Sequence, residues 1–247
     1  MTLFTPRSGP WRGDRLFPNP FQPRISCVVC AFNEGERIAG VLETIDGHPS
    51  LEEVIVVDDG STDDTADIVR DFPGVDLISY GRNRGKTFAM AQGIAAARGD
   101  YVMFLDADLA GLKPGDIDLL RAPVALGQAD TSISLRGNSL KIYRQIGLDL
   151  VSGERLIPRW LLSDQVAAME ALPRWGAEAF INALVVQLKL SIAVVDWPDV
   201  VNTRKHDKVG AMQGMMEDLR MIGDACKVMS SWGLMRQTVG MLRLVVT

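Results

Sequence analysis

The sequence predicts an α/β protein built on a mostly parallel sheet with helices on its faces. Short apolar runs of strand length alternate with amphipathic runs of helix length through the first half of the chain. This alternation is typical of βαβ units, and consecutive units of this kind build a parallel sheet. With 247 residues, 47% of them hydrophobic, the chain is long enough for one sizeable core.

The pattern predicts the order of the elements and the organisation of the chain. Ser61 is the expected cap of the second helix. The expected strands are 25–31, 54–57, 75–79, 101–105, 131–135 and 192–197. The expected helices are 36–45, 61–72, 87–98, 140–151 and 176–190. The expected units are an irregular arm at 1–23, a main domain at 24–209 with halves 24–110 and 111–209, and an amphipathic helical extension at 210–247.

Charge and composition exclude several classes of function. The net charge of -5 argues against nucleic acid as a partner. The sequence has no run of about 18 apolar residues and no apolar leader, so we expect neither a spanning helix nor a signal peptide. Cys27 and Cys30 lie three apart in an expected strand and should face opposite sides, which argues against a redox pair. The expectation is a cytoplasmic protein, with peripheral contact at the inner face of the membrane as an alternative.

Acidic side chains follow three of the expected strands. Glu34 comes after the first strand, Asp58 and Asp59 after the second, and Asp106 and Asp108 after the fourth. The carboxyl ends of parallel strands meet at one edge of a sheet, where ligands bind in open α/β proteins. Clustered carboxylates repel one another unless a cation or several hydroxyls join them. Taken alone, the Asp106–Asp108 pair fits two turn-forming aspartates as well as the ligands of a hard divalent cation such as Mn²⁺ or Mg²⁺.

Residues 25–109 resemble the nucleotide-sugar half of family-2 glycosyltransferases. The matching segments, in order, are Cys30–Glu34, Val56–Thr65, Asn83–Lys86 and Gly99–Asp108. The resemblance implies the GT-A form of a Rossmann-like fold, a UDP- or GDP-sugar donor and a Mn²⁺ or Mg²⁺ cofactor. The donor-binding residues that it implies are Ala31, Asn33, Glu34, Asp58, Asp59, Lys86, Asp106 and Ala107. The metal ligands that it implies are Asp106, Asp108 and His206, the last by similarity to glucosyl-3-phosphoglycerate synthases.

The second half resembles the acceptor side of polyprenyl-phosphate sugar transferases. Ser152–Arg155 resembles a loop there, and Gly176–Glu178 resembles a helix start. The residues expected to contact acceptor or phosphate are Arg136, Ser152, Arg155, Arg204, Lys205 and Lys208. With Asp106 and Asp108, the candidate catalytic residues are Glu154 and Glu178, either of which could act as a general base.

Several alternatives stay open from the sequence. The preferred acceptor is a polyprenyl phosphate, and the alternative is a small soluble phosphorylated acceptor of the phosphoglycerate type. A nucleotidyltransferase or a non-catalytic nucleotide-sugar binding module would use a similar fold. Inversion and retention of the anomeric configuration are both compatible with the resemblances. The methionine-rich C-terminal segment fits packing, a homodimer interface or a membrane surface.

Overall fold

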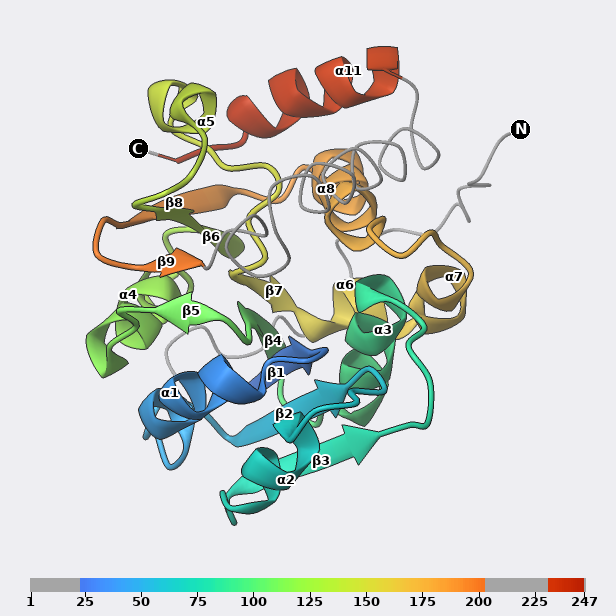
Figure 1. Ribbon diagram of the computed structural model, residues 1–247. Coiled ribbons are helices and arrows are strands. Elements are labelled where there is room, and N and C mark those ends of the chain that lie inside the picture. Colours follow the sequence, from blue (N-terminus) through green and yellow to red (C-terminus); the bar gives the residue numbers. More distant parts are fainter. Residues whose placement is uncertain (1–22, 203–230, 247) are drawn as a thin grey trace.

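The computed structural model describes residues 23–202 and 231–246, and within them it contains one large mixed sheet (Figure 1). The strand order is β3-β2-β1-β4-β7-β6-β8. These strands are Ile25–Ala31 (β1), Glu53–Asp58 (β2), Val75–Ser79 (β3), Tyr101–Asp106 (β4), Thr131–Arg136 (β6), Arg155–Pro158 (β7) and Ile192–Trp197 (β8). A separate two-stranded sheet pairs β5 (Leu109–Ala110) with β9 (Val201–Asn202).

The first four strands form the parallel part of the sheet. β1 pairs in parallel with both β2 and β4, and β2 pairs in parallel with β3. β7 is antiparallel to both β4 and β6, while β6 and β8 are parallel. It follows that β6 runs in the same direction as β4. The carboxyl ends of β1, β2, β4 and β6 consequently meet at one edge of the sheet, which is where the sequence predicts the functional groups.

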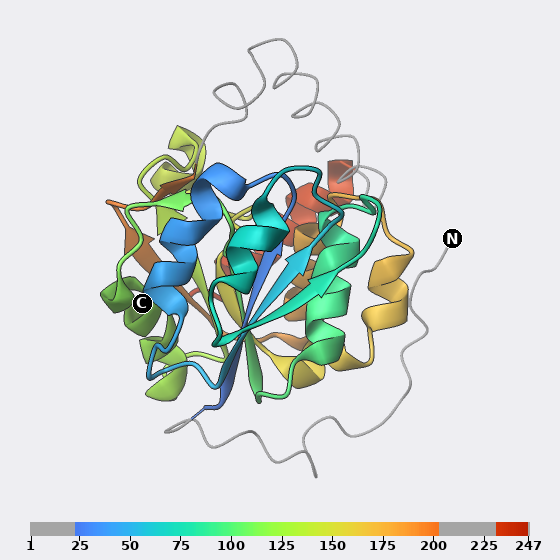
Figure 2. The ribbon, with the colours of Figure 1, turned by 60° about the horizontal axis from the view of Figure 1, so that its bottom comes forward.

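Helices cover both faces of this sheet, and Figure 2 shows α1 and α3 on opposite sides of it. One core packs α3 and α8 against the sheet through residues such as Ile94 and Ile181. The other packs α1 and α4 through residues such as Leu42 and Leu120. The helices are Gly35–Ile45 (α1), Thr65–Arg70 (α2), Lys86–Ala96 (α3), Pro114–Ala125 (α4), Lys141–Ile146 (α5), Arg159–Ser163 (α6), Val166–Glu170 (α7), Ala177–Leu188 (α8) and Ser231–Leu242 (α11).

The structure confirms the predicted fold class and most of the predicted strands. Cys27 and Cys30 contribute to different cores and are free thiols, as expected for residues on opposite faces of a strand. Burial raises the pKa of both thiols, which opposes thiolate chemistry. Among residues 23–202 and 231–246, no helix has the length and apolar character needed to cross a membrane.

Three local predictions were wrong, each for a physical reason. The second helix begins at Thr65 rather than at Ser61, because the Ser61 hydroxyl instead accepts a hydrogen bond from the Asn33 amide at 2.9 Å. α5 ends at Ile146 rather than continuing to residue 151, because Gly147 adopts a left-handed conformation that terminates the helix. Arg155 begins a buried strand instead of lying in a loop. The expected arm at 1–22 and the segment 203–230 lie outside the described residues.

The turn after β2 depends on a glycine. Gly60 has a φ of 74°, and a Cβ atom there would lie 2.5 Å from the carbonyl carbon of Arg82. Gly47 has a similar φ of 68°, but a Cβ atom there would have no neighbour within 4 Å. The two positions share the conformational requirement and differ only in the available space.

We predict that Gly60→Ala destabilises the fold more than Gly47→Ala does. The left-handed conformation alone should cost Gly47→Ala about 1–2 kcal/mol, whereas Gly60→Ala adds the displacement of the Arg82 backbone. Urea unfolding of the two variants and the parent measures both free energies of unfolding. Equal losses of stability would show that the close approach at Gly60 is not a constraint.

Candidate active site

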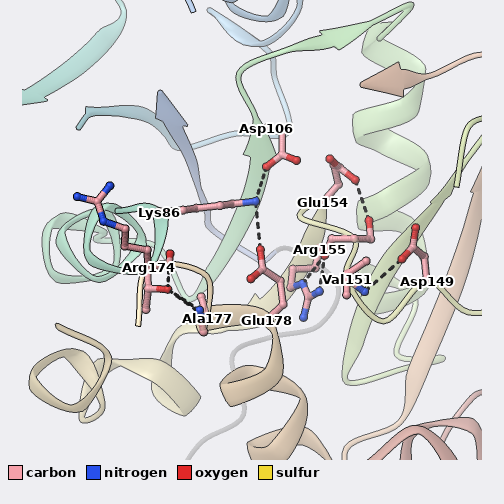
Figure 3. Close-up of polar contacts among 12 residues, drawn as sticks. Lys86, Asp106, Asp149, Val151, Glu154, Arg155, Arg174, Ala177 and Glu178 are labelled. Atoms are coloured by element: carbon pink, nitrogen blue, oxygen red, sulfur yellow. Dashed lines mark hydrogen bonds and ion pairs between the residues drawn. The ribbon is translucent and has the colours of Figure 1, made fainter. Parts of the chain in front are cut away.

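Asp106 occupies the centre of the candidate site, at the carboxyl end of β4. The ammonium nitrogen of Lys86 donates to its Oδ1 at 2.7 Å, and Arg136 Nη1 lies 3.6 Å from its Oδ2 (Figure 3 shows the Lys86 contact). Burial acts to raise the pKa of Asp106, but the two cations outweigh it and hold that pKa below its usual range. Asp106 is therefore a carboxylate at neutral pH.

Lys86 connects the two halves of the chain. Its ammonium also lies 3.1 Å from Glu178 Oε1, so it bridges the carboxylates of β4 and α8 (Figure 3). Lys86 and Glu178 stand in the first turns of α3 and α8, and these helix starts meet through Thr87. The Thr87 hydroxyl accepts from the Gly176 and Ala177 amides at 3.0 and 3.2 Å. A side chain of α3 thus caps the start of α8.

Arg136 is a buried cation fixed by acidic neighbours. Its Nη1 donates to Glu154 Oε1 at 2.8 Å, and its Nη2 lies 4.0 Å from Asp149 Oδ2. The second oxygen of Glu154 accepts from the hydroxyls of Ser134 and Ser152 at 2.8 and 2.7 Å. Burial raises the pKa of Glu154 despite the Arg136 charge. Both oxygens of Glu154 are in use, so it suits holding Arg136 better than the predicted general-base role.

Gly153 allows the acceptor-side turn to approach Asp106 closely. A Cβ atom at position 153 would lie 2.5 Å from Asp106 Oδ1 and 2.9 Å from both its Cγ and its Oδ2. Any larger residue there would push the Asp106 carboxylate away. The sequence indicated Gly153 only as part of a motif, because a close backbone approach cannot be seen before the fold is known.

Near Arg136, the acidic side chains outnumber the basic ones, and a divalent cation would balance the difference in charge. Of the residues that the structure describes, five acidic ones act electrostatically on Arg136 or Arg155, and the buried cations nearby number three. The acids are Asp106, Asp108, Asp149, Glu154 and Glu178, and the cations are Lys86, Arg136 and Arg155. Carboxylate oxygens are also the donors that Mn²⁺ and Mg²⁺ prefer.

The donor set therefore fits the predicted metal, with two carboxylates within the described chain. Asp108 is buried two residues after Asp106, which is the last residue of β4. Among the described residues, no cluster of three or more His, Cys, Asp or Glu side chains could hold a metal ion. His206, the expected third ligand, lies outside them.

The residues expected to face the nucleoside line the ends of β1 and β2. Asn33 has a positive φ of 55°, and its side-chain oxygen accepts from the Thr62 amide at 2.8 Å, which ties the two loops together. Asp59 is buried, and its two oxygens accept from the amides of Arg84 and Gly85, both at 2.7 Å. Asp59 thus shapes the loop that leads to Lys86, and its contact with a base stays a prediction.

The other residues expected to bind the nucleotide-sugar donor lie at the same edge of the sheet. Asp58 is buried and accepts from the Ser61 amide at 3.0 Å and from the Ser79 hydroxyl at 2.8 Å, which is a structural role. Glu34 accepts from Arg37 Nε at 2.6 Å. Ala31 and Ala107 are buried and leave little side chain at the strand ends.

An open cavity of about 480 Å³ lies beside the Asp59 loop. The Arg84 guanidinium carbon lies 3.3 Å from the centre of the Phe88 ring, and the Tyr80 ring meets Phe88 edge to face at 5.5 Å. Stacked aromatic and guanidinium groups favour planar or anionic ligands. The lining residues are Tyr80, Gly81, Arg82, Arg84, Phe88 and Gln92.

The structure separates the predicted acceptor residues. Arg136, Ser152 and Arg155 are all buried, and Arg136 Nη1 lies 3.6 Å from Asp106 Oδ2. Arg155 donates to the Ser152 carbonyl from Nε at 3.1 Å and to Asn182 Oδ1 at 2.9 Å (Figure 3 shows Arg155 pointing away from Asp106). Its guanidinium is thus engaged inside the protein, which argues against the predicted contact with an acceptor phosphate. Arg204, Lys205 and Lys208 lie outside the described residues.

Sequence reasoning missed the supporting network behind Arg136. Ser134 and Asp149 both belong to it, and the Ser139 hydroxyl donates to Asp149 Oδ2 at 2.6 Å. Ser132 and Ser134 alternate with apolar residues along β6, and every position of that strand is buried. Serines buried within a strand need polar partners, so these serines were the one sign in the sequence that a buried polar network lies there.

Comparisons with known proteins agree with this geometry. Residues 26–123 match the family described as "Glycosyl transferase family 2". A dolichyl-phosphate beta-glucosyltransferase of Trichomonas vaginalis is 26% identical, over 82% of this chain and 75% of its own. The dodecaprenyl-phosphate galacturonate synthase of Rhizobium johnstonii is 33% identical, over 55% of this chain and 40% of its own. The chain thus spans most of the first relative's length and less than half of the second's.

The fold similarity reaches further along the chain than the family match does. Glucosyl-3-phosphoglycerate synthase of Mycobacterium tuberculosis, solved with Mn²⁺, UDP and glucosyl-3-phosphoglycerate, superimposes with a TM-score of 0.64 at 26% identity. The superposition covers 85% of this chain and 82% of that one. These matches favour a glycosyltransferase over a nucleotidyltransferase. Residues 26–123 thus resemble glycosyl transferase family 2, and the described sheet has the GT-A fold of that synthase.

Proposed function

We propose that the protein transfers a sugar from a UDP- or GDP-sugar to a polyprenyl phosphate, assisted by Mn²⁺ or Mg²⁺. One observation carries the proposal: Asp106 lies between a cation of the donor half, Lys86, and a cation of the acceptor half, Arg136. Two substrates that each bear phosphate would bring negative charge to this point from both sides. Fixed cations on both sides can position and neutralise them.

On the donor side, Lys86 and Glu178 form an adjustable pair. A lysine has a long flexible stem, so the Lys86 ammonium can leave Asp106 and follow a diphosphate that enters the site. Asp106 and Asp108 would hold the metal ion, which supplies charge neutralisation for the departing nucleoside diphosphate. Asp106 would then exchange one cationic partner for another while staying ionised.

On the acceptor side, Arg136 is the positioning cation. A phosphate monoester has a second pKa of about 6 and is largely ionised at neutral pH. Its oxygen can attack the anomeric carbon without a strong base, while the bond from that carbon to the diphosphate oxygen breaks and the electron pair leaves with the nucleoside diphosphate. A hydrogen-bonded Glu154 that holds Arg136 and takes no proton fits this chemistry.

The relatives differ in the acceptor that their names specify. Two curated relatives act on a dolichyl or dodecaprenyl phosphate, whereas the solved synthase forms a glucosylated phosphoglycerate. Both acceptors carry a phosphate, so Arg136 serves either one. The lipid acceptor is the primary proposal, and the soluble phosphorylated acid is the second candidate because the synthase superimposes over most of the chain.

The metal assignment predicts the behaviour of Asp108. Asp108→Ala should lower the Mn²⁺-dependent affinity for UDP or GDP by more than about tenfold, because one of two carboxylate ligands is lost. The affinity measured in EDTA should not change. Isothermal calorimetry gives both values, with Asp67→Ala, an exposed carboxylate on α2, as the matched control. Unchanged Mn²⁺-dependent affinity in Asp108→Ala would contradict the assignment.

The close approach of Gly153 predicts a second effect. Gly153→Ala should displace the Asp106 carboxylate, and a displacement of about 1 Å can lower a rate about a hundredfold. Gly115→Ala is the control, since a Cβ atom there has no neighbour within 4 Å. Transfer rates and melting temperatures should be measured for both variants. A Gly153→Ala enzyme with the parent rate would show that Asp106 does not need this turn.

The acceptor is tested with two substrates and one conservative variant. Sugar transfer to a short, water-soluble prenyl phosphate is expected, and transfer to 3-phosphoglycerate is not. Arg136→Lys keeps the charge but cannot meet Glu154, Asp149 and Asp106 together. It should raise the KM for the acceptor by a larger factor than it changes the donor affinity.

Arg159→Lys is the control for this variant, because Arg159 Nε donates to the Gly99 carbonyl near the start of β4. Transfer to phosphoglycerate alone would replace the lipid acceptor by the second candidate. An unchanged acceptor KM in Arg136→Lys would remove Arg136 from the acceptor site.

A further inference from the structure

α11 presents an apolar stripe to the outside of the molecule. Met235, Val239 and Leu242 are 53%, 44% and 36% exposed, and their spacing of four and three residues puts them on one helix face. The opposite face packs on the domain, where Met241 is buried and Gln237 donates to the Ala179 carbonyl at 2.7 Å. α11 is therefore anchored by one face and has apolar side chains in solvent on another.

Basic residues flank this stripe without acidic ones. Arg236 and Arg243 are exposed and lie seven residues apart, on the same side of the stripe. Residues 231–246 contain no Asp or Glu, although the whole chain has a net charge of -5. An exposed apolar face with a purely basic flank is the pattern of helices that lie in a membrane interface.

α5 carries a second apolar and basic surface, in which Arg144 also lies 3.8 Å from Asp196, and it is connected to the candidate site. Leu140 and Ile142 are 63% and 55% exposed, and the neighbouring Lys141 and Arg144 are the charged residues of this helix. Residues 137–148 contain no Asp or Glu. Arg144 Nη1 donates to the Arg136 carbonyl at 2.8 Å, so α5 is tied directly to the cation of the acceptor side. Figure 1 draws α5 and α11 at the same end of the molecule.

We infer that α5 and α11 form a surface that binds an anionic lipid bilayer, with Leu140, Ile142, Met235, Val239 and Leu242 entering the interface. The inference rests on the proposed lipid acceptor, which the bilayer would present next to Arg136. Charge selects the bilayer over a second copy of the chain, because two such surfaces would bring their basic flanks together. Anionic headgroups match those flanks, and the apolar side chains match the acyl boundary.

Vesicle binding tests the surface with matched variants. The full chain should sediment with phosphatidylglycerol–phosphatidylcholine vesicles at low salt and be released by 0.5 M NaCl. Arg236→Gln and Arg243→Gln should each weaken binding about fivefold, and Val239→Glu should abolish it. Leu119→Glu on α4 and Leu126→Glu directly after it, at positions that are 52% and 61% exposed, should bind as the parent does.

Each outcome separates the surface from the proposed function. Transfer to a water-soluble prenyl phosphate without vesicle binding overturns the surface and leaves the function standing. Vesicle binding without any transfer supports the surface and overturns the function. A dimer by light scattering that Val239→Glu dissociates assigns the stripe to a second copy. If Val239→Glu lowers the melting temperature sharply, the stripe is covered by the chain itself; in either case the inference fails.

Discussion

The site depends on the position of Asp106 between Lys86 and Arg136. The carboxylate ends a buried parallel strand, and each cation comes from a different half of the chain. Lys86 begins α3, and Gly153 lets the acceptor-side turn approach the Asp106 carboxylate closely. Sheet topology thus provides the carboxylate, and two separate packing contacts set what surrounds it.

The buried partners around Arg136 required the desolvation of several charges, and they hold these charges in fixed positions. Removing one partner from a buried pair such as Arg136 and Glu154 typically costs about 3–5 kcal/mol, since the remaining charge stays buried. Two serine hydroxyls also bind Glu154, and Asp149 lies 4.0 Å from Arg136. In the proposed function, a cation held in this way would keep its place when substrates bind, whereas Lys86, with its flexible stem, would follow them. The site combines one fixed and one adjustable positive charge.

The parallel half of the fold was predictable because its signals are local. Apolar runs, turn glycines and strand-end carboxylates each occupy a few consecutive residues, and the strand at Ile25–Ala31 was predicted to the residue. The second half was harder. β7 contains Arg155 and follows Glu154, and buried charges hide a strand from any hydropathy pattern. α4 begins and continues with prolines, Pro114 and Pro123, that read as breaks. Which basic residues are buried depends on long-range pairing, so the burial of Arg155 in β7 could not be predicted from the sequence.

Thr87 has a consequence for how the chain can be divided. Its hydroxyl, on the donor side, supplies the missing acceptor for the first amides of a helix on the acceptor side. β4 likewise has its outer edge occupied by β7. A fragment ending near residue 110 would keep the donor-side motifs. It would lack β7, so the edge of β4 would be unpaired, and the Thr87 hydroxyl would lose the two amides that it binds. Such a fragment should aggregate through that edge. A chimera that joins this donor half to the acceptor half of another protein would have to take residues 87 and 174–177 from the same parent.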